Sequence, residues 1–193
     1  MQIEEHIPLL ESILDRWQTA LGNQYQPYKN HVYRVLNFCL ALHPCSEEEK
    51  EKLIIAGCFH DLGIWPDDIV DYLPPSIELA EQYLRENDRE NWSDEIRLMI
   101  DLHHKLRAVK DCEYPLVEVF RKGDWTDVSK GFRSFELPKP YVKAVIAKFP
   151  NLGFHDNLMR LTREEFRRNP LNPLPGSALK GRKKKLKKDQ ASP

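Results

Sequence analysis

Residues 46–63 of the chain read SEEEKEKLIIAGCFHDLG, and the prediction of the fold starts from this stretch. Its first four residues have the spacing of a capping box, in which Ser46 caps the free backbone amides of a helix and the glutamate three positions later reaches back to the serine. We predict that a helix begins there, continues through the apolar run LIIAGCF and ends at Gly63, because glycine is favoured directly after a helix. An imidazole and a carboxylate, those of His60 and Asp61, then stand next to each other in the last turn of this helix.

Apolar residues recur at helical spacing along the rest of the chain, and no segment shows the sustained alternation of a half-buried strand. We therefore predict an all-α, single-domain helical bundle of about seven to eight helices that spans residues 1–174. The predicted helices cover, in order, residues 7–20, 28–42, 46–62, 74–85, 94–109, 115–128 and 138–149, with a short last helix capped at Thr162.

Length and composition limit the classes of protein to which the chain can belong. With 193 residues and 41% hydrophobic residues, it is long enough to bury one sizeable core. No run approaches the roughly 18 apolar residues of a membrane span, and the N-terminal sequence MQIEEHIPLLESILDRW lacks the basic start and apolar stretch of a signal peptide. The four cysteines form no CxxC pair, which is typical of reduced thiols. We therefore expect a cytoplasmic protein that makes no contact with a membrane.

The end of the chain differs in charge from the rest. Residues 180–188 include seven basic residues and no acidic one, whereas the whole chain has a formal net charge of -1, so the remainder is acidic. We expect residues 175–193 to form a disordered, solvated tail, because charge runs of this kind rarely pack and no aromatic residue interleaves with these lysines. Contact of this tail with nucleic acid or anionic lipid is the alternative.

Two further residues form a pattern with the His60-Asp61 pair. His31 lies 29 residues before His60, near the start of a predicted helix, and Asp124 lies 63 residues after Asp61, at the end of another. Taken alone, such a histidine is more typical of a hydrogen-bonded core residue, and such an aspartate of a solvated helix end. Taken together, imidazole and carboxylate groups in the order H…HD…D indicate a shared site for a divalent ion such as Mn, Fe, Co, Ni or Zn.

This order of residues resembles the HD superfamily of metal-dependent phosphohydrolases, and the likeness covers roughly residues 28–130. The run from Ile96 to the pair His103-His104, followed about 20 residues later by an aspartate, is also similar to the family's pattern. The resemblance implies a helical fold of the HD type and one divalent ion, for which Mn, Co, Ni, Fe, Mg and Zn are all candidates. It further implies that the ion is held by His31, His60, Asp61 and Asp124.

His103 and His104 need separate roles, because neighbours on a helix point about 100° apart. His103 fits the apolar face of Ile96 and Ile100 better than His104 does. In the family that the chain resembles, histidines in this region complete a second metal site or contact the phosphate, and a second site usually needs a further histidine after the HD pair. Since no histidine stands between Asp61 and His103, we expect one metal, with His103 or His104 binding or protonating the phosphate of the substrate.

The other polar candidates carry weaker signals. Arg34 and Lys105 are candidates to neutralise phosphate oxygens, and Asp67 or Asp68 to orient a water molecule. An ordinary surface charge is the alternative for each of the four.

A second His-Asp dipeptide provides an internal control. His155-Asp156 lies in a predicted loop, with no matching helix before it and no matching aspartate after it. We expect this dipeptide to lie at the surface. His6 and His43 also lack partners in the sequence, and we expect them at the surface or at a helix end.

The pattern favours hydrolysis of a small phosphorylated substrate, such as a nucleotide, by metal-activated water. In this mechanism Asp61 touches the ion and orients the water, while His103 or His104 counters the charge that develops on the transferred group. The acidic body argues against wide contact with duplex nucleic acid. Two alternatives stay open, namely an HD-type hydratase or lyase that acts on a small non-phosphorylated substrate, and a helical binding module without enzymatic activity. The oligomeric state is open as well.

Overall fold

The computed structural model of the chain describes residues 1–67, 72–110, 112–157 and 159–160. Within these ranges the regular elements are all helices, which confirms the predicted all-α bundle. The predicted helix capped at Thr162, the predicted end of the domain at residue 174 and the basic tail lie outside the described residues. Among the helices of the described ranges, none is both long and apolar enough to cross a membrane.

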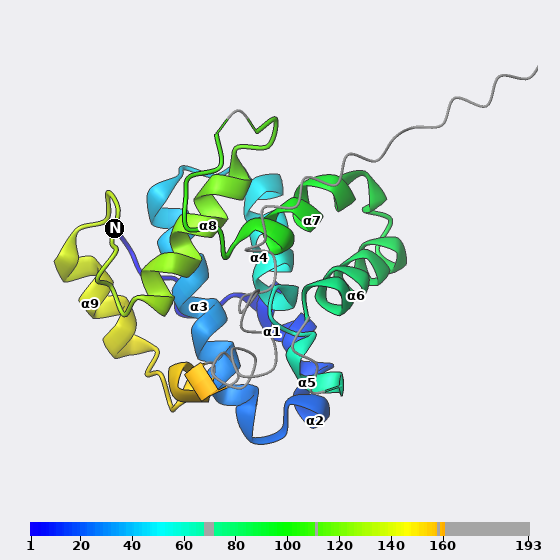
Figure 1. Cartoon of the computed structure of the whole chain (residues 1–193), viewed down its shortest axis with the longest axis horizontal. Helices are drawn as coiled ribbons and strands as arrows, with labels where there is room; N and C mark the ends of the chain where they lie inside the picture. The colour runs from blue at the N-terminus through cyan, green and yellow to red at the C-terminus, as the bar shows by residue number, and fades with distance from the viewer. Residues whose placement is uncertain (68–71, 111, 158, 161–193) are drawn as a thin grey trace, which may run out of the picture.

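Helices α3 and α8 pack against each other in the middle of the bundle, with α9 on one side and α4, α7 and α6 on the other (Figure 1). The predicted first helix, over residues 7–20, is divided into α1 and α2. The elements are α1 (Pro8–Asp15), α2 (Gln18–Leu21), η1 (Gly22–Gln24), α3 (Tyr25–Leu42), α4 (Glu47–Phe59), α5 (Ile64–Asp67), α6 (Leu73–Glu86), η2 (Glu90–Trp92), α7 (Ser93–Leu102), α8 (Leu116–Val128) and α9 (Lys139–Lys148), where η denotes a short 3-10 helix.

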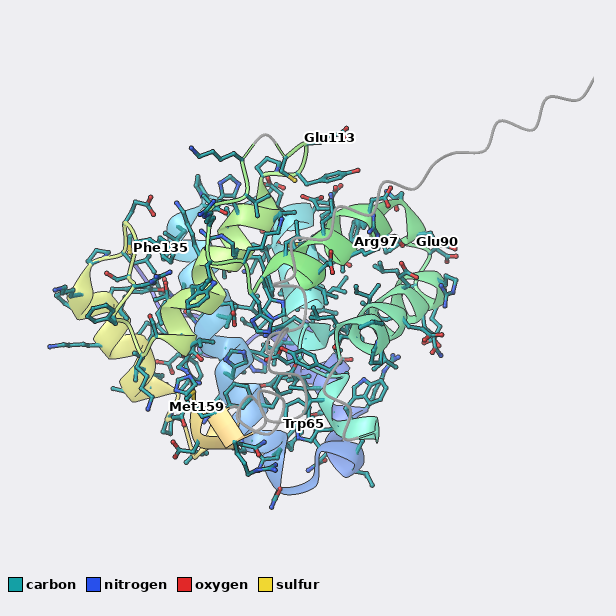
Figure 2. The ribbon with its side chains drawn as sticks, in the orientation of Figure 1. Trp65, Glu90, Arg97, Glu113, Phe135 and Met159 are labelled. Atoms are coloured by element: carbon teal, nitrogen blue, oxygen red, sulfur yellow. The ribbon has the colours of Figure 1, made fainter. Side chains whose placement is uncertain are left out.

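Helix α3 is buried along most of its length, because other helices cover it on several sides. Its apolar residues, such as Val32, are buried, and so are the polar residues His31 and Arg34. The charged side chains of Glu90 and Glu113, by contrast, lie at the rim of the molecule (Figure 2). Because buried polar groups are normally hydrogen-bonded, the polar residues of α3 indicate that polar partners lie inside the bundle.

The capping box predicted at the start of α4 is confirmed. The amide of Glu49 donates a hydrogen bond to the hydroxyl of Ser46 at 3.3 Å, and the amide of Ser46 donates one to the carboxylate of Glu49 at 2.8 Å. These two bonds satisfy backbone amides that the first turn of a helix leaves free. The serine and the glutamate therefore fix where α4 begins.

The predicted end of α4 at Gly63 is wrong. The helix ends at Phe59, residues 60–63 form a turn, and the short helix α5 follows where no helix was predicted. Gly63 is needed for close packing, because a Cβ at this position would lie 2.5 Å from the carbonyl oxygen of Tyr72 and 2.7 Å from the amide nitrogen of Ser76. The turn with His60-Asp61 is thereby held against the start of α6.

Helix α7 ends at Leu102, well before the predicted end near Val109. The carbonyl oxygen of Lys105 accepts hydrogen bonds from the side chains of Arg121 and Trp125 in α8, both at 3.1 Å. These bonds satisfy a backbone group that a longer helix would have satisfied internally. Contact with α8 therefore replaces the last turns of the predicted helix.

Gly123 allows α8 to approach α3 closely. A Cβ at this position would lie 2.4 Å from the sulfur of Cys39 and 3.0 Å from the carbonyl oxygen of Val35. Cys39, like the other three cysteines, is a free thiol. Because the two helices are so close, the residue after this glycine, Asp124, reaches the side of α3 that carries His31.

Candidate metal centre

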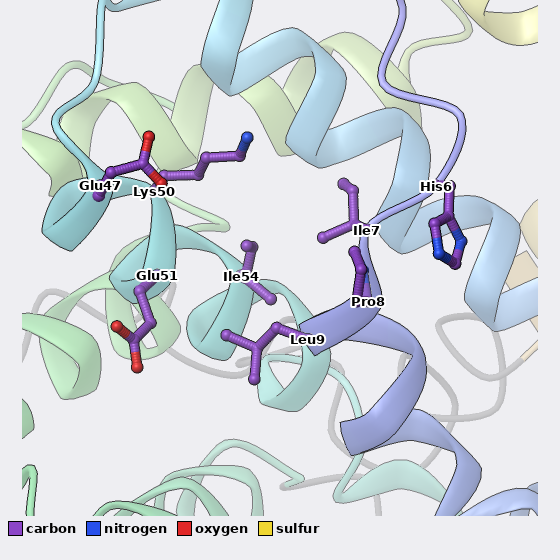
Figure 3. A pocket seen from close by; sticks show the side chains of 8 residues that line it. All are labelled: His6, Ile7, Pro8, Leu9, Glu47, Lys50, Glu51 and Ile54. Carbon is purple, nitrogen blue, oxygen red and sulfur yellow. The ribbon is translucent and has the colours of Figure 1, made fainter.

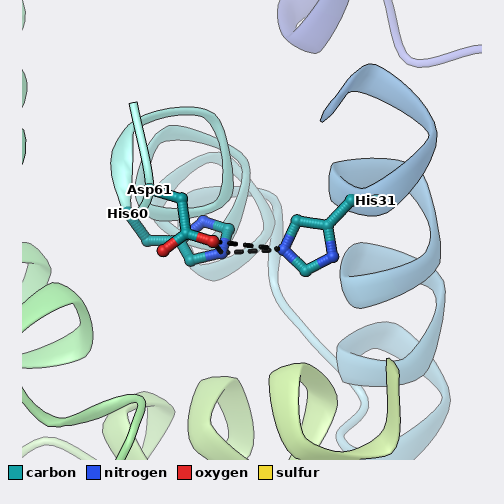
Figure 4. Close-up of side chains that lie close together, drawn as sticks. All are labelled: His31, His60 and Asp61. Atoms are coloured by element: carbon teal, nitrogen blue, oxygen red, sulfur yellow. Dashed lines mark hydrogen bonds and ion pairs between the residues drawn. The ribbon is translucent and has the colours of Figure 1, made fainter. Parts of the chain in front are cut away.

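The four predicted metal ligands converge at one buried point. His31 comes from the first half of α3, His60 and Asp61 from the turn after α4, and Asp124 from the second half of α8. Each of the four residues is 2% exposed or less. Figure 4 shows the imidazole of His31 pointing from α3 toward His60 and Asp61.

The distances within this group resemble those between ligands of a single ion. His31 Nε2 lies 3.0 Å from His60 Nε2, and Asp61 Oδ2 lies 3.8 Å from the first and 3.4 Å from the second of these atoms. Asp124 Oδ1 lies 3.7 Å and 3.8 Å from the same two nitrogens. Ligands bound at about 2.1 Å from an ion stand about 3.0 to 3.5 Å apart at right-angled to tetrahedral positions. His31, His60 and Asp61 can therefore bind a metal ion, and Asp124 lies beside their imidazoles.

The orientation of the two imidazole rings favours a cation between them. His60 Nδ1 donates a hydrogen bond to the carbonyl oxygen of Gly57 at 2.8 Å, and His31 Nδ1 donates one to Asp127 Oδ2 at 2.6 Å. In a neutral imidazole with its proton on Nδ1, Nε2 carries only a lone pair. The two Nε2 lone pairs then face each other at 3.0 Å, an arrangement that repels unless a cation lies between them. Metal-binding histidines commonly show this same hydrogen bond on the opposite ring nitrogen.

Several polar atoms around this point lack a hydrogen bond. Among the described residues, Asp61 Oδ1, Asp124 Oδ1 and His103 Nε2 are buried atoms with no hydrogen-bond partner. Since most buried polar atoms in native proteins are paired, each such atom needs an explanation. A cation at the centre provides one for Asp124 Oδ1, whereas Asp61 Oδ1 and His103 Nε2 face each other at 3.5 Å.

Burial changes the protonation of the group in the metal-free protein. Burial lowers the pKa of His60 to about 3 and raises the pKa of Asp124 to about 6. Burial alone would raise the pKa of Asp61 as well, but the adjacent imidazoles, first of all that of His60, hold its pKa below its usual range. An imidazole that stays unprotonated at neutral pH is in the form that binds metal.

A second group of potential ligands shares Asp61 with the first. The donor atoms of Asp61, His103 and His104 lie within 4.8 Å of one another. His103 Nε2 lies 3.5 Å from Asp61 Oδ1, and its Nδ1 donates to the carbonyl oxygen of Ile100 at 2.6 Å. His104 hydrogen bonds to the hydroxyl of Tyr72, and its pKa is lowered, chiefly by burial. The two histidines therefore lie beside the first group, on the side of α7.

The predicted phosphate-binding cations have different positions. Arg34 is 1% exposed, so it is not a surface charge. Its Nε lies 2.5 Å from Asp127 Oδ1, and a terminal nitrogen donates to the carbonyl oxygen of Phe149 at 2.8 Å. We therefore assign Arg34 to the support of Asp127 and not to a bound phosphate. Lys105 is exposed just after the two histidines and remains a candidate.

Of the two aspartates considered for orienting water, only the backbone of Asp67, in α5, is described. Asp68 lies outside the described residues. His6 is exposed, as predicted. His43 follows the last residue of α3 and lies 3.3 Å from Glu49, which confirms its position at a helix end.

The prediction that His155 lies at the surface is wrong. Its side chain is buried, and its Nε2 lies 3.3 Å from Asp127 Oδ2. Asp156 is exposed, as predicted. The predicted loop is wrong as well, because residues 154–157 are helical. The histidine is buried because this stretch lies against α3 and α8, which spacing along the chain does not reveal.

Asp127 supports His31 and was not predicted from the sequence. It is fully buried and contacts His31, Arg34 and His155. Residues three apart on a helix share a face, so its position three residues after Asp124 in the string GDWTD could have indicated it. Burial alone would raise its pKa, but the hydrogen bonds from His155 and His31 and the charge of Arg34 hold it well below its usual value.

A separate pocket lies between the N-terminal segment and the start of α4 (Figure 3). Its volume is about 260 Å³. None of the predicted site residues lines it, so we do not connect it with the metal centre. Its lining residues are His6, Ile7, Pro8, Leu9, Glu47, Lys50, Glu51 and Ile54.

Comparison of the chain with protein-family models, with curated proteins and with solved structures finds no match. The resemblance to the HD superfamily therefore stays a prediction from the sequence of the chain. The evidence for a metal centre is the geometry of its side chains.

Proposed function

We propose that the chain is a metal-dependent phosphohydrolase of the HD type that acts on a small phosphorylated substrate. The observation that carries this proposal is the pair of imidazole Nε2 atoms of His31 and His60, 3.0 Å apart beside the carboxylates of Asp61 and Asp124. Nitrogen and oxygen donors of this kind suit Mn, Co, Ni, Fe, Mg or Zn, and one such ion is proposed.

A bound divalent ion would supply hydroxide near neutral pH and polarise a phosphoryl oxygen. Asp61 is suited to orient the attacking water, because one of its oxygens faces the imidazoles and the other has no hydrogen-bond partner among the described residues. This second oxygen lies on the side of His103, whose Nε2 is 3.5 Å away.

His103 is the proposed acid for the leaving oxygen. Burial alone would lower its pKa, but the carboxylate of Asp61, 3.5 Å from its Nε2, and the charge of Asp124 outweigh burial and raise its pKa above the usual value. A group that holds its proton near neutral pH can donate it to a leaving group. His104 lies beside it, and Lys105 is the candidate to bind phosphate from the surface.

One observation favours the alternative of a hydratase or lyase that acts on a small non-phosphorylated substrate. Phosphoryl transfer normally uses several cations around the transferred group. Arg34 is bound to Asp127, so of the two predicted cations only Lys105 is available for phosphate.

The test is a panel of nucleoside mono-, di- and triphosphates and small phosphomonoesters, assayed with Mn, Co, Ni, Mg and Zn. We expect turnover of at least one phosphorylated compound by the native protein, and its loss in His60→Ala together with the bound metal. If the metal binds but no phosphorylated compound turns over, the hydratase or lyase replaces the proposal. If neither the native protein nor His60→Ala binds metal, the alternative of a binding module without enzymatic activity replaces the proposal.

A further inference from the structure

We propose that Phe154 and His155 are positioning residues of the metal centre, which hold the ring of His31 in the orientation that turns its Nε2 toward His60. Both residues lie in the short helical stretch at residues 154–157, which follows α9 in the chain. The proposal rests on the metal centre of the proposed function and not on the chemistry of the substrate.

Phe154 fixes the plane of the His31 ring. The two rings are stacked, with centroids 4.3 Å apart and an angle of 19° between their planes. Phe154 is only 2% exposed, so the stack is closed off from solvent. Rotation of the imidazole about its last side-chain bond would drive its edge into the phenyl ring.

His155 acts on the same ring through Asp127. Asp127 Oδ2 lies 2.6 Å from His31 Nδ1 and 3.3 Å from His155 Nε2. An ionised carboxylate only accepts hydrogen bonds, so both imidazole nitrogens must act as donors. His155 therefore fixes the oxygen that receives the proton of His31 Nδ1, and this proton in turn leaves Nε2 free as a ligand.

The residues just before this helical stretch are attached to the part of α3 that carries His31. Asn30 donates a hydrogen bond to the carbonyl oxygen of Pro150 at 2.8 Å, and Arg34 donates one to that of Phe149 at 2.8 Å. These two residues flank His31 on either side in the helix. Figure 1 shows the chain after α9 running beside this half of α3. The rings of Phe154 and His155 are thus held close to the imidazole of His31.

A purely space-filling role does not account for a histidine at position 155. Its Nδ1 is buried and has no hydrogen-bond partner among the described residues. An unpaired buried polar atom costs free energy that an apolar side chain of similar size would avoid. The contact between Nε2 and Asp127 is the feature of His155 that an apolar residue could not provide.

Two polar substitutions of His155 distinguish its contact with Asp127 from its packing in the interior. In His155→Gln the side-chain amide nitrogen replaces Nε2 and can donate to Asp127, whereas in His155→Asn the amide is too short to reach it. His43→Asn is the matched control, because His43 Nε2 lies at the same distance of 3.3 Å from the carboxylate of Glu49 on another part of the fold. Phe154→Leu tests the stack.

The first measurement is the dissociation constant of the full chain for Zn²⁺ and Co²⁺, by chelator competition at a temperature where circular dichroism shows each variant folded. We expect His155→Asn to bind about 10 to 100-fold more weakly than the native protein, as is usual for loss of an outer partner of a metal ligand. Phe154→Leu should also bind more weakly, while His155→Gln and His43→Asn should stay near the native value. Equal affinity of the Asn and Gln variants would overturn the role of His155.

The second measurement does not depend on metal. Long-range ¹H–¹⁵N spectra of the metal-free protein report which ring nitrogen of His31 carries the proton. We expect the proton on Nδ1 in the native protein and in His155→Gln, and a mixture of tautomers in His155→Asn. If the native protein binds no metal but the tautomer of His31 still changes in His155→Asn, the proposed metal centre is wrong and the positioning role of His155 is supported. An unchanged tautomer in His155→Asn contradicts the positioning role.

Discussion

The chain contains two His-Asp dipeptides with opposite surroundings. At His60-Asp61 both residues are buried, and the histidine donates from Nδ1 to Gly57 while its Nε2 faces the Nε2 of His31 at 3.0 Å. At His155-Asp156 only the histidine is buried, and its Nε2 faces the carboxylate of Asp127, which accepts its proton. The first dipeptide is therefore a candidate ligand pair, because its imidazole faces another hydrogen-bond acceptor. The histidine of the second dipeptide is a supporting residue, because its imidazole donates a hydrogen bond to a carboxylate.

The largest expected contrast is in metal binding. Asp61→Ala should abolish binding or weaken it by more than about 100-fold, because loss of even an outer partner of a ligand costs about 10 to 100-fold. Asp156→Ala should leave the affinity unchanged, since Asp156 is exposed. Isothermal titration with Zn²⁺ or Mn²⁺ measures both. Equal losses of metal affinity in the two variants would contradict the assignment of different roles to the two dipeptides.

The glycines next to the two dipeptides should differ in their effect on stability. Gly63→Ala should lower the free energy of unfolding by about 2 to 3 kcal/mol, because its Cβ would lie 2.5 Å from the backbone oxygen of Tyr72. Gly153 has φ +86° and no atom within 4 Å of an added Cβ. Gly153→Ala should therefore cost only the backbone strain, about 1 to 2 kcal/mol. Urea unfolding measures the two values, and a larger cost at Gly153 would contradict the packing role of Gly63.

Two aspartates of α8 repeat the contrast between unpaired and paired groups. In the metal-free protein the pKa of Asp127 is held low by its partners, whereas burial raises the pKa of Asp124 to about 6 from its ordinary value near 3.8. Between about pH 4 and pH 6 the folded state keeps a proton on Asp124 that the unfolded state releases. The contribution of this group to stability is therefore lost as the pH rises through this range.

Asp124→Asn removes this dependence on pH. In the presence of a chelator at pH 7, the variant should be more stable than the native protein by on the order of 3 kcal/mol, because a pKa shift of one unit corresponds to about 1.4 kcal/mol. With saturating metal the order should reverse, since the variant lacks a ligand. Denaturant titrations from pH 4 to pH 7 test this, and a less stable variant in chelator at pH 7 would contradict it.

Local sequence signals were sufficient for much of the fold. Helical spacing predicted the all-α bundle, and the spacing of Ser46 and Glu49 predicted the start of α4, because both depend on residues close together in the chain. The ends of α4 and α7 were predicted wrongly, because each is determined by contact with another helix. The carbonyl oxygen of Lys105, for example, is bound by side chains of α8.

The candidate site was predictable only in part. The order of His31, His60, Asp61 and Asp124 in the sequence placed them in one group, which the structure brings together. Their support was missed because it depends on contacts between distant segments. Asp127 lies 96 residues from His31 in the chain, and His155 lies 28 residues beyond Asp127. The position of Asp127 three residues after Asp124 was a local signal, but no local pattern connects His155 with the site.

The most direct test of the metal centre is X-ray absorption spectroscopy of the Zn²⁺-loaded protein, combined with the metal content per chain. The account predicts one tightly bound ion, with imidazole nitrogens at about 2.0 to 2.1 Å in the first coordination shell and a loss of this signal in His31→Ala. A native protein that retains no ion after exposure to Zn²⁺, Mn²⁺ and Co²⁺ at neutral pH would contradict it, and so would an unchanged shell in His31→Ala.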